Sequence, residues 1–485
     1  MRKLFFIVVL LFLFSPPAYA ITVCSTGADY TTLDDGLSNW TAGNNLELCR
    51  GETFQRVSVG TISLGDMSGA KLKAYGTGNN PIILSQSSSS PGIDFGQGSW
   101  DGPSETVGIA NATFENIKFM GLFDSTENKY VGTGLRFRFN SNNVTIENCE
   151  FENLGIGIHI KYNLNDNGNN GESSADNQTD FSVKNNTFKN GTGLAALLGG
   201  GPDFYFGYNT ITNWGAPNKF SHSLYLGCAD QNKPLGLGAN AACTQLVEYN
   251  TISGGTPNET GQCVGAEIVT HGYVNGLTIS NNTISEPNGS EGGCWGILVN
   301  PAYSGSNNHP WYATQPELLS NVTISDNFIQ DVGNAYIFAE NVDGFTVTNN
   351  QIFATRENSF KSRGIVMREV PSETALGANR MKDITITGNT LWLRPDERGR
   401  YDFVEFGPNL PSGYPANPST TNSFNVGQLP PLDAICGGLD AGYVAEHDVN
   451  GDNSVNQEDV SLMFKLLSQG GTLTETYGPY LRSSQ

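Results

Sequence analysis

The segment NVTISDNFIQ, residues 321–330, is followed 23 residues later by GFTVTNNQIF, residues 344–353. In both segments polar residues alternate with Val, Ile or Phe, and an asparagine, Asn327 or Asn350, ends the alternation. A period of two is typical of a β-strand with one buried face. The pair therefore indicates a repeated unit made of a short strand and an asparagine turn.

The same unit recurs along most of the chain. Strands of about four to six residues cannot bury a face alone, so the units are expected to stack as parallel coils ~4.8 Å apart. Each asparagine side chain can then bond to the next, and asparagine also tolerates the left-handed backbone of a turn. The pattern predicts an all-β fold, a parallel β-solenoid. The expected ladder is Asn186, Asn209, Asn250, Asn282, Asn327, Asn350 and Asn389, with Ile117 and Cys149 at this position in two earlier copies.

A second short strand follows each asparagine turn, as in GIHIKYN (157–163) and GIVMRE (364–369). Alternation places Ile158 inside and His159 outside, and likewise Ile365 inside and Val366 outside. The outward positions of successive coils form a strip that suits an extended polysaccharide. Its members are Arg138, Lys161, Asn300, Glu340, Arg368 and Glu405, with Tyr225, Glu267 and His271 close to it.

This strip holds the residue types of two kinds of polysaccharide cleavage. Elimination needs a cation to neutralise a carboxylate and a base to remove the C5 proton. Hydrolysis needs two carboxylates ~5 to 9.5 Å apart, and Glu267, Glu340 and Glu405 are available for it. The candidate catalytic residues are Lys161, His222, Tyr225, Glu267, His271, Glu340 and Arg368.

Four further residues are candidates for substrate binding: His159, Asn300, Trp311 and Tyr312. The last two belong to a long loop, and long loops of a solenoid usually line its binding face. Each candidate has a structural alternative. His159 and Lys161 suit a solvated outer face, and Arg368 suits a surface ion pair with Glu369.

The N-terminus has the features of a secretory signal peptide. Arg2 and Lys3 precede an apolar run that ends at Phe14, and Ala18-Tyr19-Ala20 is a small-x-small cleavage signal. We expect cleavage near Ala20 and a secreted protein, extracellular or periplasmic. No second apolar run follows, and the net charge of −21 disfavours nucleic acid and anionic membranes as partners.

All eight cysteines lie beyond the predicted signal peptide. An even number of cysteines in an exported chain suggests disulfides. Cys149 lies inside a repeat and is expected to be a buried thiol. Three local pairs are predicted: Cys24 with Cys49, Cys228 with Cys243, and Cys263 with Cys294.

With its repeats and the opening stretch GADYTTLDDGL (27–37), the chain resembles the right-handed parallel β-helix proteins of the pectate-lyase-like superfamily. The resemblance covers residues 21–425. It implies a short N-terminal helix that plugs the first coil, with Leu33, Leu37 and Trp40 on its apolar side and Thr31 or Thr32 as its cap. The superfamily includes lyases, hydrolases, esterases, epimerases and adhesins, so a non-catalytic glycan-binding or adhesive protein is the alternative to an enzyme.

The C-terminal region, residues 426–485, contains DVNGDNSVNQED (448–459). Oxygen-bearing residues at positions 1, 3, 5, 7, 9 and 12 form the calcium loop of an EF-hand. The helical stretch VSLMFKLL follows, and together they resemble one calcium repeat of a dockerin, which implies a cohesin-like scaffold partner. Dockerins normally carry two such repeats, and this chain has one. The predicted Ca²⁺ ligands are Asp448, Asn450, Asp452, Ser454, Asn456 and Asp459.

Overall fold

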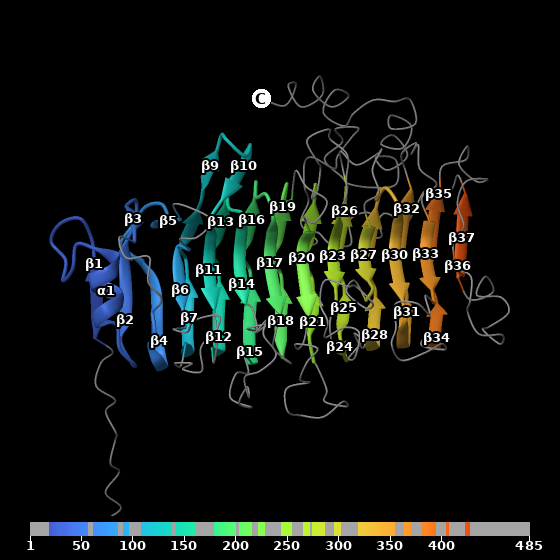
Figure 1. Cartoon of the computed structure of the whole chain (residues 1–485), viewed down its shortest axis with the longest axis horizontal. Coiled ribbons are helices and arrows are strands. Elements are labelled where there is room, and N and C mark those ends of the chain that lie inside the picture. The colour runs from blue at the N-terminus through green and yellow to red at the C-terminus, as the bar shows by residue number, and fades with distance from the viewer. Residues whose placement is uncertain are drawn as a thin grey trace, which may run out of the picture.

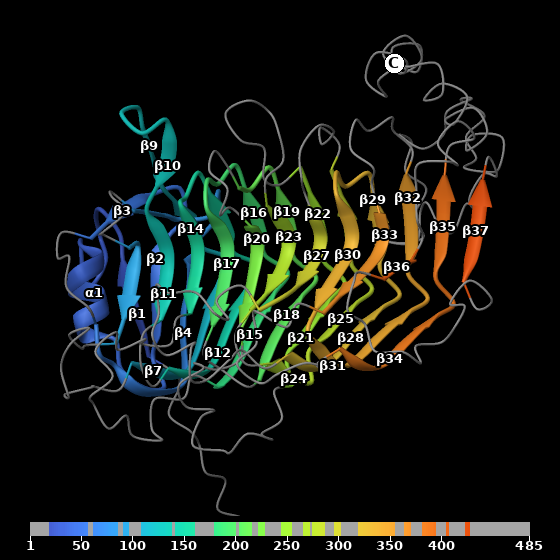
Figure 2. The ribbon, with the colours of Figure 1, turned by 45° about the vertical axis from the view of Figure 1, so that its right-hand side comes forward.

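The chain winds into a rod of three parallel β-sheets in a computed structural model (Figures 1 and 2). Most coils contribute one strand to each sheet, so strands far apart in sequence lie side by side. The structure describes residues 19–56, 62–85, 91–96, 108–137, 141–160, 179–199, 203–215, 222–227, 244–254, 265–271, 274–286, 295–301, 319–354, 363–369, 381–393, 404–406 and 422–426.

The first sheet contains β1 Ala20–Val23, β2 Asn45–Cys49, β4 Gly65–Tyr75, β7 Ile109–Glu115, β12 Asn142–Glu147, β15 Thr179–Lys184, β18 Phe204–Gly207, β21 Leu246–Glu248, β24 Val274–Asn275, β25 Thr278–Ser280, β28 Leu319–Ser325, β31 Val342–Thr348 and β34 Lys382–Thr387. The second contains β3 Thr53–Gln55, β5 Ile82–Leu84, β8 Lys118–Met120, β13 Glu150–Glu152, β16 Thr187–Lys189, β19 Thr210–Thr212, β22 Thr251–Ser253, β26 Thr283–Ser285, β29 Phe328–Gln330, β32 Gln351–Ala354, β35 Thr390–Leu393 and β37 Ser423–Val426. The third contains β6 Ile93–Phe95, β11 Thr133–Phe137, β14 Ile156–Ile160, β17 Leu194–Gly199, β20 His222–Gly227, β23 Ala266–Thr270, β27 Trp295–Val299, β30 Ala335–Glu340, β33 Arg363–Arg368 and β36 Val404–Phe406.

A coil therefore has three strands, one more than the sequence pattern indicated. The alternating segment forms the first-sheet strand, and the predicted second strand belongs to the third sheet. Between them, the residues directly after the asparagine form a strand of their own, such as β16, which pairs in parallel with β13 and β19. A three-residue strand shows too little alternation to be recognised from sequence alone.

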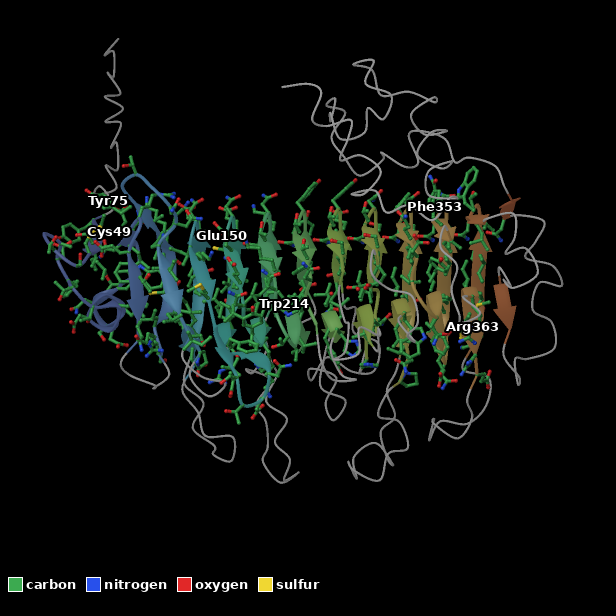
Figure 3. The ribbon with its side chains drawn as sticks, turned by 90° about the horizontal axis from the view of Figure 1, so that it is seen from above. Cys49, Tyr75, Glu150, Trp214, Phe353 and Arg363 are labelled. Carbon is green, nitrogen blue, oxygen red and sulfur yellow. A yellow bond between two sulfur atoms is a disulfide. The ribbon has the colours of Figure 1, made fainter. Side chains whose placement is uncertain are left out.

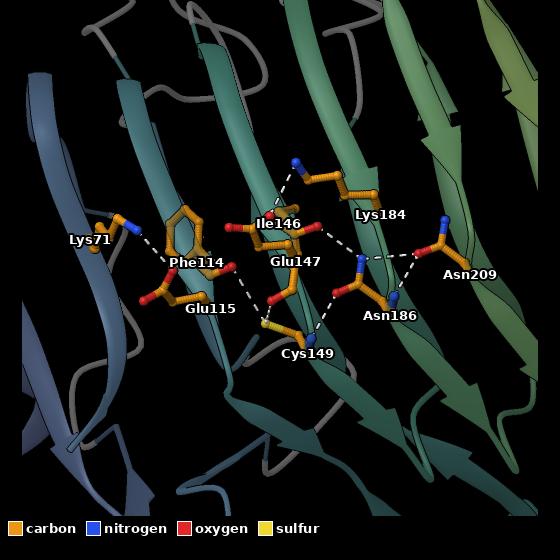
Figure 4. A network of polar contacts seen from close by, with 9 residues as sticks. All are labelled: Lys71, Phe114, Glu115, Ile146, Glu147, Cys149, Lys184, Asn186 and Asn209. Carbon is orange, nitrogen blue, oxygen red and sulfur yellow. Dashed lines mark hydrogen bonds and ion pairs between the residues drawn. The ribbon is translucent and has the colours of Figure 1, made fainter. Parts of the chain in front are cut away.

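The predicted asparagine ladder is present and continuous. The Oδ1 of Asn209 accepts hydrogen bonds from the backbone N–H and the Nδ2 of Asn186, at 2.9 and 3.0 Å. The same pair of bonds links each later ladder residue to the next, and Asn422 extends the ladder by one coil. Cys149 begins it by donating its N–H to Asn186 Oδ1 (Figure 4).

The left-handed backbone conformation lies one residue before each ladder position. Asn185 and Asn349 have φ angles of 56° and 57°, whereas the ladder residues that follow them are not among the positive-φ residues. The sequence pattern predicts both the ladder bond and the left-handed turn for the same asparagine. Two neighbouring residues divide them, because the ladder side chain must point inward while the residue before it makes the turn.

Aromatic and aliphatic stacks fill the rod. Phe119, Phe151 and Phe188 of the second sheet stack with centroids 5.1 and 4.7 Å apart. Ile211 and Ile252 continue this column in the next coils. Trp214 is fully buried inside the rod (Figure 3). Ring stacking of this kind adds ~0.5 to 1.5 kcal/mol per pair to the burial of apolar area.

The N-terminal coils contain the predicted helix and one predicted disulfide. Helix α1, Leu33–Asn39, is capped by Thr32, whose side chain accepts a hydrogen bond from the N–H of Asp35. Leu33 and Leu37 are buried. Cys24 and Cys49 form a disulfide, as predicted. Residues 1–18 of the predicted signal peptide, the pairs Cys228–Cys243 and Cys263–Cys294, and the calcium loop lie outside the described residues.

Two remaining features concern reactivity and surface. Cys149 is a free, buried thiol, as predicted, and burial raises its pKa to about 12. Strands β9 Leu122–Asp124 and β10 Lys129–Val131 form an antiparallel hairpin that projects from the rod (Figure 2). Within the described part of the chain, no helix is long and apolar enough to cross a membrane.

Candidate functional site

The outer face of the third sheet carries most of the predicted site residues. Its central column is apolar: the sheet register aligns Tyr225, Val269, Leu298, Phe338 and Val366. Val366 points away from the core as predicted, but it is fully buried instead of solvated. We call the buried cluster on this face the outer apolar floor. It consists of Ala266, Val269, Leu298, Ala335, Phe338 and Val366, with Tyr225 and Trp295 packed against it.

Near-continuous apolar runs such as WGILV and YIFA were the sequence signal for this floor. A strand that is buried on both faces loses its alternation. The outward Leu298 and Phe338 therefore mark a covered face, whereas a solvated strip would carry polar residues there.

Polar side chains flank one edge of the floor. His271, Asn300, Glu340 and Arg368 come from the C-terminal ends of neighbouring third-sheet strands or the residues directly after them. Glu340 lies opposite Arg368 in the sheet register. The Arg368 guanidinium lies over the Phe338 ring, 5.1 Å from its centroid, so the cation packs on the floor. The predicted column Asn300, Glu340 and Arg368 thus lies together, and His271 joins it.

Tyr225 lies between two histidines. Its ring centroid is 6.1 Å from that of His222 and 5.1 Å from that of His271. Burial lowers the pKa of both imidazoles from 6.5 to about 4. Both rings are therefore neutral at pH 7.

Hydrogen bonds assign opposite tautomers to the two histidines. His222 Nδ1 accepts a bond from the N–H of Ala266, at 3.0 Å, so its proton is on Nε2. His271 Nδ1 lies 2.6 Å from the carbonyl oxygen of Asn300. Because a carbonyl only accepts, His271 donates from Nδ1 and has its lone pair on Nε2. One imidazole is thus a potential proton donor and the other a potential base.

Glu267 is not on this face. It is 1% exposed, and Ser223 Oγ donates a hydrogen bond to its Oε2. In the sheet register Glu267 shares a column with Ala195 and Tyr336, which belong to the interior core. The placement of Glu267 close to the outward strip was therefore wrong. The strand bends here so that residues 267 and 268 both face inward, which strict alternation cannot predict.

The other sequence candidates lie apart from the histidine pair. His159 belongs to the same column as Tyr225 but two coils earlier, beyond Leu197. Lys161, Trp311 and Tyr312 lie outside the described residues, as do Arg138 and the side chain of Glu405.

The opposite edge of the floor carries residues that the candidate set did not include. Trp295 and Arg363 flank Ala335 in one column, and Figure 3 shows Arg363 at the side of the rod. Both are the first residues of their strands, WGILV and RGIVMR, so the sequence signal was their position at the start of an apolar run. The described residues contain no group of three or more His, Cys, Asp or Glu side chains that could hold a metal ion.

Comparisons with known proteins assign no family to the chain. No family model matches it, and no curated protein is significantly similar in sequence. Among solved structures, the Dettilon tailspike protein matches with a TM-score of 0.42 and 13% identity, over 86% of this chain and 69% of its own.

Two other structures have the same level of similarity. The tailspike protein of E. coli bacteriophage HK620, in complex with a pentasaccharide, has a TM-score of 0.42 and 15% identity, over 81% of this chain and 59% of its own. A rhamnogalacturonan lyase has a TM-score of 0.42 and 10% identity, over 77% of this chain and 87% of its own. Because these TM-scores are below 0.5, the assignment of the β-helix fold rests on this chain's own parallel sheets.

Proposed function

We propose that this protein is a polysaccharide lyase that cleaves a uronic-acid-containing glycan on the outer face of the third sheet. The observation that carries the proposal is the pair of neutral histidines with opposite tautomers on either side of Tyr225. Elimination needs a base for the C5 proton and a hydrogen-bond donor for the departing oxygen, and this pair supplies one of each.

In the proposed reaction, a uronate residue lies over Tyr225 between the two imidazoles. His271 Nε2 takes the C5 proton, the C5–H electron pair forms the C4=C5 double bond, and the C4–O4 bond breaks. The departing O4 accepts a hydrogen bond from His222 Nε2 and takes up the proton that His271 removed from C5, so both imidazoles end neutral. Arg368 lies three coils beyond His271, ~14 Å at ~4.8 Å per coil, where it would bind the carboxylate of a further uronate along the polymer.

The positions of the carboxylates favour elimination over hydrolysis. A glycoside hydrolase needs two carboxyl groups on the same side of the sheet. Of the described candidates, Glu340 lies on the outer face and Glu267 lies in the interior. The described part of the third sheet therefore offers Glu340 without Glu267 as its partner.

The alternative of a non-catalytic glycan-binding protein predicts isolated polar residues along the strip. The two histidines are clustered instead: His222 and His271 come from adjacent coils, with Glu340 and Arg368 two and three coils beyond His271. Clustering of groups of catalytic type supports the enzyme.

The test is to incubate the full-length protein with polygalacturonate, rhamnogalacturonan and alginate, and to follow reducing ends together with ultraviolet absorbance of unsaturated products. We expect both signals to rise, and His271→Gln to lower kcat by about 10² to 10⁴-fold. Thr346→Ala, on the outer face of the first sheet, is the control and should retain activity. Reducing ends without unsaturated product would indicate hydrolysis, and no product from any substrate would refute the enzyme.

We also propose that the protein is exported and that residues 448–459 bind Ca²⁺. The Cys24–Cys49 disulfide supports an oxidising compartment. The donor set of the loop, hard oxygen atoms at alternating positions, supports calcium. Attachment to a cohesin-like scaffold follows from the dockerin resemblance and would use this same segment.

A further inference from the structure

The repeat provides an internal reference for each position of the coil. The residue before each ladder position has a left-handed backbone, and in most coils it is Asn, Asp or Gly, the residues that tolerate that conformation. Two adjacent coils differ and have a tyrosine there. The residues at this position are Asn116, Asn148, Asn185, Tyr208, Tyr249, Asn281, Asp326, Asn349 and Gly388, with φ between 54° and 69°.

The two tyrosines carry a conformational cost that the other coils avoid. A left-handed backbone costs a bulky L-residue roughly 1 to 2 kcal/mol. Tyr208 and Tyr249 have φ angles of 57° and 55°, so both coils bear that strain. Strain that the surrounding structure maintains is often associated with function.

The strained tyrosines form an exposed aromatic surface. Their rings are stacked, with centroids 4.9 Å apart and planes 10° from parallel. Tyr208 is 53% exposed and Tyr249 is 46% exposed, whereas most phenylalanine rings of the described residues are buried. Exposed stacked rings of this kind often mark an interaction site.

The same two coils also depart from a second repeat, on the outer face of the first sheet. Tyr205 and Leu246 interrupt a column whose other members are threonine or serine. Glycine at position 207 leaves space for the Tyr205 side chain, because a Cβ on Gly207 would lie 2.4 Å from the Tyr205 hydroxyl oxygen. The column is Thr113, Thr145, Ser182, Tyr205, Leu246, Thr278, Thr323, Thr346 and Thr385.

A carboxylate accompanies the aromatic rings. Glu248 lies opposite Gly207 in the sheet register, near enough to Tyr205 for its charge to add to the effect of burial on the pKa of the Tyr205 hydroxyl. Burial, with a contribution from Glu248, raises the pKa of Tyr205 to about 12, so its hydroxyl remains a donor at neutral pH. The patch therefore offers apolar ring faces beside hydrogen-bonding oxygens.

We propose that Tyr205, Tyr208, Tyr249 and Glu248 form a second carbohydrate-binding surface, the tyrosine platform, for a neutral polysaccharide. The C–H face of a pyranose packs on a tyrosine ring, and its hydroxyl groups bond to polar atoms at the edge. Glu248 would repel a uronate, which favours a neutral chain. The platform lies at the corner of the first and second sheets and not on the third, so it does not depend on the proposed lyase activity.

A purely structural role for the stack predicts different behaviour from a binding role. Tyr208→Asn with Tyr249→Asn installs the residue type that the other coils use. If the tyrosines serve binding, this double variant relieves strain, and its melting temperature is unchanged or higher. If they serve only to hold the coils together, the melting temperature falls and glycan binding is unchanged.

The experiment is affinity electrophoresis of the full-length protein in gels containing hydroxyethylcellulose, galactomannan or xyloglucan, with polygalacturonate as the acidic comparison. We expect retardation by at least one neutral polymer and a tenfold or greater loss of affinity in the double Asn variant. Tyr208→Phe with Tyr249→Phe keeps the rings and should retain binding, as should Asn349→Ala at the same position three coils away.

Three outcomes would overturn the platform: no retardation in any neutral gel, unchanged affinity of the double Asn variant, or failure of that variant to fold. Cleavage of polygalacturonate by the same double variant is measured in parallel. The substitutions of the double Asn variant lie outside the third sheet, so we expect its cleavage of polygalacturonate to equal that of the wild type. Loss of neutral-glycan binding and loss of lyase activity can therefore be recognised separately.

Discussion

At the scale of single residues, one ladder asparagine side chain forms hydrogen bonds with several backbone and side-chain groups at once. Asn282 Oδ1 accepts bonds from the N–H and Nδ2 of Asn250, and its own Nδ2 donates to Asn327 Oδ1 and to the carbonyls of Val247 and Ser280. All these groups lie inside the rod. There, leaving a polar atom without a hydrogen bond lowers the free energy of unfolding by more than one satisfied hydrogen bond raises it. The ladder therefore specifies the register of the coils.

Asn282→Ala is expected to lower the free energy of unfolding by about 3 kcal/mol, because it leaves the Asn250 donors unsatisfied. Asn422→Ala, at the end of the ladder and partly exposed, should cost about 1 kcal/mol. Denaturant unfolding followed by circular dichroism measures both. Equal costs at the two positions would contradict the role given to burial.

The buried histidine at the site makes stability depend on pH. Burial lowers the pKa of His271 from 6.5 to about 4, so between these values the unfolded chain binds protons that the folded chain does not. The contribution of His271 is thus complete above pH 6.5 and is lost as the pH falls toward 4, with a slope of at most ~1.4 kcal/mol per pH unit.

The difference in unfolding free energy between wild type and His271→Gln isolates this effect from other titrating groups. It should shift in favour of the variant as the pH is lowered from 6.5 to 4. A difference that stays constant with pH would show that the folded and unfolded states of His271 titrate alike. Unfolding curves collected at several pH values in this range provide the measurement.

At the scale of elements, short strands are stable here because their neighbours in adjacent coils complete them. Strand β13 has three residues, yet its central Phe151 stacks on Phe119 of β8 and Phe188 of β16. Isolated strands of this length would not persist. The third-sheet strands differ, because their outward side chains, the outer apolar floor, are buried as well.

Phe151→Ala should destabilise the protein by about 3 to 5 kcal/mol, since it removes the middle ring of a buried stack. Phe123→Ala is the matched control: Phe123 is 53% exposed on the projecting hairpin and contacts the ring of Tyr130. Its loss should change stability by no more than about 0.5 kcal/mol. Thermal unfolding of the two variants distinguishes them, and similar shifts would argue against the stack.

At the scale of the whole molecule, the rod presents different chemistry on different sides. The third sheet carries the histidine pair over an apolar floor, and the corner of the first and second sheets carries the tyrosine platform. A solenoid allows this separation because each coil contacts mainly its neighbours, so one face can change without altering the others. Both proposed surfaces run along the rod, as an extended polymer requires.

The proposed calcium loop is tested on the full-length chain. Titration calorimetry with CaCl₂ should show binding that is lost in the variant Asp448→Ala with Asp452→Ala, because two of the charged ligands are then missing. Asp343→Ala, in the first sheet, is the control and should bind calcium as the wild type does. Unchanged calcium binding in the double variant would disprove the assignment of residues 448–459.

The sequence by itself determined the parallel winding, the ladder from Asn186 to Asn389 and the Cys24–Cys49 bond. These depend on a repeated local pattern or on short separation, which leaves a periodic signal in the residues. Only the tertiary structure decided that Glu267 faces inward, that Val366 is covered, and that the left-handed residue precedes the ladder. Each of these depends on where a strand bends or on what packs against its second face, and alternation within one strand contains neither.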